Sequence, residues 1–172
     1  TLAAFTGVVI VRHHVVAARL ALLAPQQDSH QHALIIALHR ASLTTALTAA
    51  FGGHGVAAYQ HTSNSRVHNG FAATFVLCAL FHFAMESLVE RRAGLSSRLA
   101  RATRLILVVI SSLACATFIS HVIVEETLRT PIGIGKWRAA LAEILTCLCF
   151  IVYIATYSRS FHETSLTLSV SY

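Results

Sequence analysis

Long apolar runs separated by short polar connections dominate the chain. They cover residues 1–11, 41–58, 67–89, 105–124 and 139–157. A helix needs about 20 apolar residues to cross a hydrocarbon core of ~30 Å, and all runs but the first approach this length. The pattern predicts an all-α fold, a polytopic bundle of transmembrane helices. One domain is expected over residues 1–158, followed by a short cytosolic tail over residues 159–172.

The first apolar run is short and ends at a basic residue, Arg12. An arginine at the centre of a span costs roughly 2.5–3.5 kcal/mol on the insertion scale, so we predict that the span ends there. Residues 15–23 then form a short interfacial helix, and polar residues 39–40 precede the second span. Because residues 1–11 are too few to cross a membrane, we interpret them as the tail of an incomplete span. The chain is then a fragment with five of six helices.

Composition supports a membrane protein and excludes two other classes. Hydrophobic residues make up 55% of the chain and charged residues 12%, with a mean hydropathy of +0.66. Soluble domains carry about 25% charged residues, so the charges here are too few to solvate the surface of a soluble enzyme. The apolar content is also too high for a disordered chain.

The net charge of +6 is divided unevenly between the two sides of the predicted membrane. One side holds nine basic residues, Arg12, Arg19, Arg40, Arg91, Arg92, Arg98, Arg101, Arg104 and Arg159. The other side holds four, Arg66, Arg129, Lys136 and Arg138. Loops rich in Lys and Arg stay in the cytosol, so the first side and the C-terminus are predicted to be cytosolic. The positive charge therefore reflects topology, and no nucleic acid partner is expected.

Glu143 is the most unusual polar residue, because it lies about six residues, ~9 Å, inside the last span. A charge at that depth is costly and usually faces the bundle interior or a wet cavity. It serves either proton or ligand coupling, or a structural role as a carboxyl bonded to a histidine or hydroxyl. Other polar residues lie towards the same side. The candidate polar cluster comprises Glu143, His68, Gln60, His54 and His121.

Five arginines follow the third span and begin the fourth. They are Arg91, Arg92, Arg98, Arg101 and Arg104. Near a membrane surface each basic residue contributes about 1 kcal/mol of attraction to anionic lipids, so this stretch is predicted to contact anionic head groups. The alternative is that it only determines topology. His82 and Glu86, spaced i, i+4, are predicted to share a helix face as a local hydrogen-bonded pair.

The eleven histidines raise the alternative of a di-haem electron carrier. His68 and His82 are fourteen residues apart, which nearly restores the same helix face. A partner helix would need a matching pair, and His39 and His54 are rotated by about 60° from such a match. Residues 147 and 149, both cysteines, point to different sides of a helix and are interpreted as apolar core thiols. We therefore expect no metal, no cofactor and no catalytic residue.

Four stretches resemble, in order, the damage-regulated autophagy modulator (DRAM) family. They are TLAAFTGVVIVRHH, LHRASLTTALTAAFGGHGVAAYQ, RVHNGFAATFVLCALFHF and AALAEILTCLCFIVYIATYSRSF. They are similar to the end of the family's second helix, its third helix, its fourth helix and its last helix. Tyr59-Gln60, His68 and Ala142-Glu143 carry the resemblance, whereas Ile144 replaces a frequent Trp. The transmembrane-150 proteins are the other close branch of this wider Frag–DRAM–Sfk group, which shares a CWH-like N-terminal domain.

The resemblance implies a six-helix membrane protein without an established catalytic site. DRAM relatives reside in lysosomal or endosomal membranes and promote autophagy. We therefore expect a non-enzymatic regulator that contacts membrane lipids and unidentified membrane or cytosolic proteins, in an endolysosomal or plasma membrane. One alternative is a plasma-membrane regulator of a phosphoinositide kinase, as in transmembrane-150 relatives. Another is an embedded enzyme or redox protein, which includes the remodelling of lipid anchors, as in Frag relatives.

Overall fold

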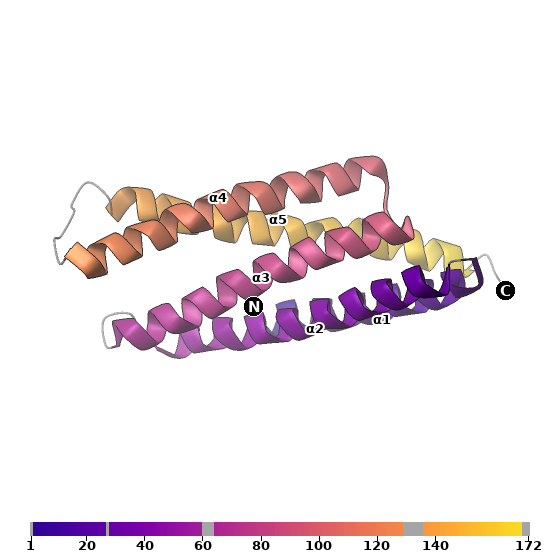
Figure 1. Cartoon of the computed structure of the whole chain (residues 1–172), viewed down its shortest axis with the longest axis horizontal. Helices are drawn as coiled ribbons and strands as arrows, with labels where there is room; N and C mark the ends of the chain where they lie inside the picture. Colours follow the sequence, from indigo (N-terminus) through magenta and orange to yellow (C-terminus); the bar gives the residue numbers. More distant parts are fainter. Residues whose placement is uncertain (1, 27, 60–63, 129–135, 170–172) are drawn as a thin grey trace.

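Long helices account for nearly all of the described chain in the computed structural model (Figure 1). They are α1 (Leu2–Leu23), α2 (Ser29–Ala58), α3 (Ser65–Ala93), α4 (Arg98–Leu128) and α5 (Lys136–Ser169), with a 3-10 turn η1 (Ala24–Gln26) after α1. The structure describes residues 2–26, 28–59, 64–128 and 136–169, without the side chains of residues 2, 26, 122, 125–128, 136 and 158–169. Five helices are long and apolar enough to cross a membrane. The predicted all-α polytopic fold is confirmed.

Each helix packs against the next along the chain, and α1 also contacts α5, so the helices form a closed ring. The pairs α2–α3 and α4–α5 make the most extensive contacts. Figure 1 shows that the α1–α2 connection, the α3–α4 connection and the C-terminal part of α5 lie at one end of the bundle. We call this the basic end, because the exposed Arg91, Arg92 and Arg98 lie there.

The first two helices are longer than the sequence predicted. α1 continues past Arg12 to Leu23, so the predicted break at Arg12 and the separate interfacial helix over residues 15–23 are wrong. α2 begins at Ser29 and runs without interruption through residues 39–40. The insertion penalty assumed an arginine that faces lipid. Arg12 is only 3% exposed and is paired inside the bundle, which offsets that cost.

Local signals define several helix ends. The Asp28 side chain accepts a hydrogen bond from the His30 amide at 3.3 Å and caps α2, and Asn64 caps α3 in the same way through the Val67 amide at 3.2 Å. α3 ends at Gly94, whose φ of +66° lies in the left-handed region that favours glycine. α5 continues as a helix to Ser169, so the predicted tail over residues 159–172 is largely helical.

Small residues allow α2 and α3 to approach closely. A Cβ added at Gly52 would lie 2.6 Å from the Phe75 amide nitrogen, and one added at Gly55 would overlap the Phe71 ring. An aromatic core lies beside this contact, where Phe83 of α3 stacks on Tyr153 of α5 with ring centroids 4.0 Å apart. Both aromatic side chains are at most 1% exposed. This core supports the polar site described next.

Candidate functional site

A buried carboxylate, Glu90, lies between two arginines from different helices. Its side chain is 0% exposed and projects from the last turn of α3. Arg12 of α1 donates from Nη2 to Glu90 Oε1, and Arg104 of α4 donates from Nη1 to Glu90 Oε2. We call Arg12, Glu86, Glu90 and Arg104 the charge cluster. The guanidinium groups donate hydrogen bonds to both carboxylate oxygens and so replace the water that this buried group has lost.

Arg104 extends the charge cluster to α5. Its Nε donates to Thr156 Oγ1 at 2.7 Å, and its Nη2 donates to the Thr156 carbonyl at 3.1 Å. The guanidinium carbons of Arg104 and Arg12 lie 5.1 Å and 4.9 Å from the centre of the Tyr157 ring, within cation–π range. The planar fork of arginine suits such bridging, since one group contacts a carboxylate, a hydroxyl and a ring. The cluster therefore joins α1, α3, α4 and α5.

The second carboxylate, Glu86, connects the charge cluster to α2. Ser42 Oγ donates to Glu86 Oε1 at 3.0 Å, and His39 Nδ1 lies 3.4 Å from the same oxygen. His82 Nδ1 lies 2.8 Å from Ser42 Oγ and 3.1 Å from the Ser42 carbonyl. Because the Ser42 hydroxyl donates to the carboxylate, His82 Nδ1 is the donor in both contacts. His39, Ser42 and His82 thus form a polar branch between α2 and α3, which we call the histidine branch.

A stacked histidine pair extends this branch to α1. The rings of His13 and His39 lie 4.1 Å apart at an interplanar angle of 8°. His39 Nε2 also lies 3.1 Å from the His13 carbonyl oxygen. Four helices, α1 to α4, therefore contribute residues to the charge cluster or to its histidine branch, and α5 contacts the cluster through Thr156 and Tyr157. Several buried polar atoms in and around this site have no hydrogen-bond partner among the described residues. They are Arg12 Nε, His13 Nδ1, His39 Nδ1, His82 Nε2, Glu86 Oε2 and Tyr157 Oη.

The charges within the cluster balance. Two arginines face two glutamates, so the ionised cluster has no net charge before any histidine is protonated. The third contact, Arg12 Nε to Glu86 Oε2, spans 3.9 Å and is an ion pair without a hydrogen bond. Balanced charges in a low-dielectric bundle are far less costly than isolated ones. Within the part of the chain that the structure describes, no three His, Cys, Asp or Glu side chains are grouped as metal ligands would be.

Four residues of the predicted polar cluster, those that the structure describes, lie away from this site. Glu143 is exposed on the outside of α5, so the structure does not direct it into the bundle. His54 is exposed on α2 and contacts its own helix through the Ala50 carbonyl, 2.7 Å from Nδ1. His68 Nδ1 lies 2.7 Å from the Tyr59 carbonyl, and His121 is half-buried on α4. Gln60 lies outside the described residues.

The five arginines predicted to contact lipid divide into two groups. Arg91, Arg92 and Arg98 are exposed and Arg101 is partly exposed, as a contact with head groups requires. Arg104 differs, because its side chain is 1% exposed and its guanidinium is bonded to Glu90 and Thr156. The prediction of a lipid contact is therefore corrected for Arg104, whose cationic group is turned into the bundle.

The geometry also bears on the di-haem alternative. The two histidine pairs proposed for haem lie on α2 and α3, so a porphyrin would have to lie between these helices. At Gly52 there is no room even for a Cβ against the α3 backbone. His39 and His82 are instead engaged with Glu86 and Ser42. Because α2 and α3 pack this closely, their histidines do not frame a haem site.

Sequence reasoning missed the charge cluster, although its components were visible. The sequence predicts a span end at Arg12 and a lipid contact for Arg104, and neither prediction places an arginine inside the bundle beside Glu90. Glu90 and Arg104 are fourteen residues apart across one connection, so a pairing between adjacent helix ends was a usable signal. His82 and Glu86 do share a face, as predicted, but Ser42 of α2 links them.

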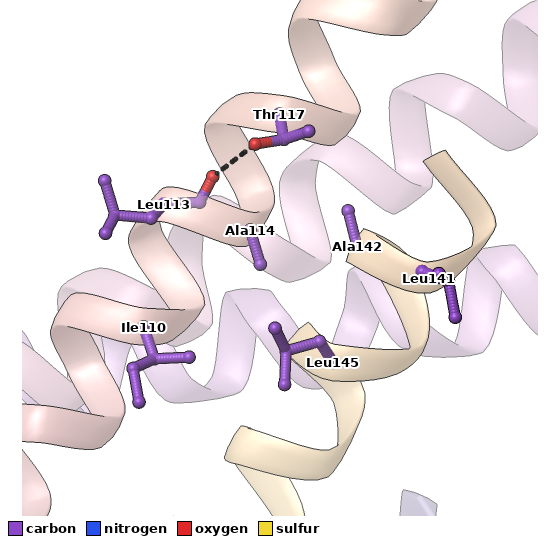
Figure 2. Close-up of a pocket in the computed structure, with 7 residues that line it drawn as sticks. All are labelled: Ile110, Leu113, Ala114, Thr117, Leu141, Ala142 and Leu145. Atoms are coloured by element: carbon purple, nitrogen blue, oxygen red, sulfur yellow. Dashed lines mark hydrogen bonds between the residues drawn. The ribbon is translucent and has the colours of Figure 1, made fainter. Parts of the chain in front are cut away.

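An apolar groove lies between α4 and α5, towards the end opposite the basic end. Figure 2 shows Ala114 of α4 and Ala142 and Leu145 of α5 pointing into it. Its volume is about 370 Å³. The hydroxyl of Thr117, also in its wall, donates to the Leu113 carbonyl of its own helix at 2.9 Å (Figure 2). The groove therefore offers apolar contact without a convergent set of polar groups.

Comparison with known families gives one match that spans nearly the whole chain. A family model described as the Frag1/DRAM/Sfk1/Cwh43P N-terminal domain matches residues 2–164. No curated protein and no solved structure matches the chain. The match includes α1 to α4, α5 as far as residue 164, and both carboxylates of the charge cluster.

Proposed function

The chain belongs to the Frag1/DRAM/Sfk1/Cwh43P N-terminal domain family, and from this premise we propose that it is a non-enzymatic, multi-pass membrane regulator of the DRAM type. It acts through contacts with membrane lipids and with membrane or cytosolic proteins. Its location is an endolysosomal or plasma membrane, with the C-terminus in the cytosol. The excess of arginines at the basic end supports this orientation.

The observation that carries the proposal is the exposed carboxyl group of Glu143. The residue lies six positions after Trp137, where the candidate span begins, and so about 9 Å along the helix axis. A carboxyl group on the lipid-facing side at that depth is costly unless a polar group meets it. The next turn of the same face carries Cys147, which is also exposed. An exposed polar group within a span supports action through an intermolecular contact.

The non-enzymatic part of the proposal is supported by the way the buried polar groups are used. Glu90 is bonded at both oxygens to arginines, and Glu86 is bonded to Ser42. Catalysis by a carboxylate requires a group that can reach a substrate. These two carboxylates instead hold the helices together, which suits a scaffold that presents its surfaces to partners.

The test compares Glu143→Ala with Cys147→Ala in the full chain. Both side chains are exposed on α5 and are separated by one helical turn, so the cysteine variant is a matched control. The readouts are localisation and autophagic flux in cells that express the tagged protein. We expect Glu143→Ala to reduce the effect on flux by about fivefold, as the loss of a contact worth about 1 kcal/mol would. Cys147→Ala should behave as the wild type.

Two results would overturn the proposal. If both variants localise and support flux as the wild type does, Glu143 has no role in an intermolecular contact. If expression of the wild-type chain does not change flux at all, regulation of the DRAM type is excluded. Equal amounts of both variants in the membrane fraction show that a difference does not arise from poor folding.

A further inference from the structure

A second groove lies between α3 and α4 at the basic end, and its lining is amphipathic. Its volume is about 570 Å³. Its polar part is formed by arginines and its apolar part by aliphatic side chains. The lining includes Arg91, Arg98, Arg101, Leu88, Leu105 and Val108.

The positive charge of this groove is not neutralised by the described acidic side chains. Their ion pairs involve Arg12, His39 and Arg104 as the cationic partners, and none includes Arg91, Arg98 or Arg101. Glu86 and Glu90 lie nearest along the chain, and both are already committed to the charge cluster. Three guanidinium groups therefore face one groove without a described counter-charge.

The groove changes from polar to apolar along the helix axes. Arg91 and Arg98 lie at the basic end of their helices, and the wall continues inward to Ala84 on α3 and to Val108 on α4. Arg91 and Ala84 are seven residues apart, as are Arg101 and Val108, so each apolar wall extends about 10 Å below the arginines. The floor contains Ser87, which is bonded to Tyr153 of the aromatic core at 3.0 Å. A groove with arginines at its opening and apolar walls below them complements an amphiphile that has an anionic head group.

We propose that this groove binds one anionic phospholipid. The lipid phosphate lies among Arg91, Arg98 and Arg101, and one acyl chain follows the wall formed by Leu88, Leu105 and Val108. Guanidinium groups suit this role because they bind phosphate oxygens in pairs and stay charged. The inference deepens the proposed function, since it rests on action through lipid contacts and names the lipid class and the site.

The test measures lipid binding to the purified full chain in detergent by native mass spectrometry. The probe is phosphatidic acid, and phosphatidylcholine with the same acyl chains is the comparison. We expect clear retention of phosphatidic acid over phosphatidylcholine. Arg98→Gln and Arg101→Gln should each weaken phosphatidic acid binding by about fivefold, and the double variant by about 25-fold.

Arg92→Gln is the matched charge control. Arg92 is exposed beside Arg91, so the variant loses the same charge near the same depth, but the residue does not line the groove. Its binding should change less than twofold. Ala102→Phe fills the groove while it keeps every arginine, and it should weaken phosphatidic acid binding at least as much as Arg98→Gln does.

Three outcomes would overturn the inference. Equal losses for Arg92→Gln and Arg98→Gln would show that general surface charge binds the lipid. Unchanged binding by Ala102→Phe would show that no acyl chain enters the groove. Competition by millimolar glycerol 3-phosphate would show a site for a free phosphate and not for a lipid. Because the assay uses purified protein, its failure leaves the flux comparison of Glu143 and Cys147 unaffected.

Discussion

At the scale of single residues, Glu90 holds two arginine side chains inside the basic end of the bundle. It lies fully buried in α3 and accepts hydrogen bonds from Arg12 and Arg104, which are distant from each other in sequence. Removing one partner of a buried ion pair leaves an uncompensated charge, which is more destabilising than the loss of the contact itself. The contribution of the charge cluster to stability therefore depends on equal numbers of positive and negative side chains.

This balance predicts non-additive effects of substitution. Arg12→Met leaves one arginine facing two glutamates, and Glu90→Gln leaves two arginines facing a single glutamate. Each single change should lower the free energy of unfolding by about 3–5 kcal/mol. The double variant restores neutrality between Arg104 and Glu86, so its loss should be smaller than the sum by about 1.5 kcal/mol or more. Reversible unfolding of the full chain in mixed micelles measures all four corners of this cycle, and strictly additive losses would exclude the predicted coupling.

The three arginines of α4 show how far sequence spacing predicts the site. Arg98, Arg101 and Arg104 are spaced three residues apart. Three residues fall short of a full helical turn, so each side chain is rotated by about 60° around the helix from the previous one. Arg98 and Arg104 therefore lie about 120° apart around the helix, one in the groove and the other in the charge cluster. Spacing alone predicts that the arginines diverge. Which one faces inward depends on Glu90 and Thr156, which belong to other helices.

At the scale of helices, the close approach of α2 to α3 depends on glycine. Gly52 faces the backbone of Phe75, which cannot move aside as a flexible side chain can. The sequence allowed this to be anticipated, because small residues in a span permit close packing. The positions of the contacting residues on α3 could not be inferred, since they depend on the relative shift of two helices.

Gly52→Ala should therefore destabilise the bundle by about 1–3 kcal/mol, the usual cost of overpacking. Gly70→Ala on α3 is the control, because an added Cβ there meets nothing within 4 Å. The control should unfold at the wild-type temperature or above it, since alanine favours a helix over glycine. Thermal unfolding in detergent compares the two variants. A wild-type melting temperature for Gly52→Ala would show that α2 and α3 are not in tight contact.

The extent of α1 shows why one element was mispredicted. The penalty applied to Arg12 is valid for a residue whose surroundings are lipid. In the bundle, the arginine meets Glu90 and lies over the Tyr157 ring, and both partners belong to later helices. Hydropathy along one segment contains no information about such partners. The last three spans lack a central arginine, and helices were correctly predicted for them, whereas α2, which contains Arg40, is also longer than predicted.

At the scale of the whole molecule, the arginines of the basic end have two separate roles. Arg12 and Arg104 are inside the bundle and neutralise its carboxylates, which leaves Arg91, Arg98 and Arg101 to face the groove. The topology that places basic residues at one end was readable from their distribution along the chain. The division between internal and external arginines was not, because it arises only when five helices close into a ring.

Thermal unfolding of the full chain in detergent, with and without phosphatidic acid, tests this division most directly. A ligand that binds only the folded state raises the melting temperature. Arg98→Gln should melt at the wild-type temperature without lipid, and phosphatidic acid should raise its melting temperature less than it raises that of the wild type and of Arg92→Gln. Arg104→Gln should already melt at a lower temperature without lipid, because Glu90 loses a partner. If Arg98→Gln and Arg104→Gln lower the lipid-free melting temperature equally, or if Arg98→Gln keeps the full rise with lipid, the two roles are not separate.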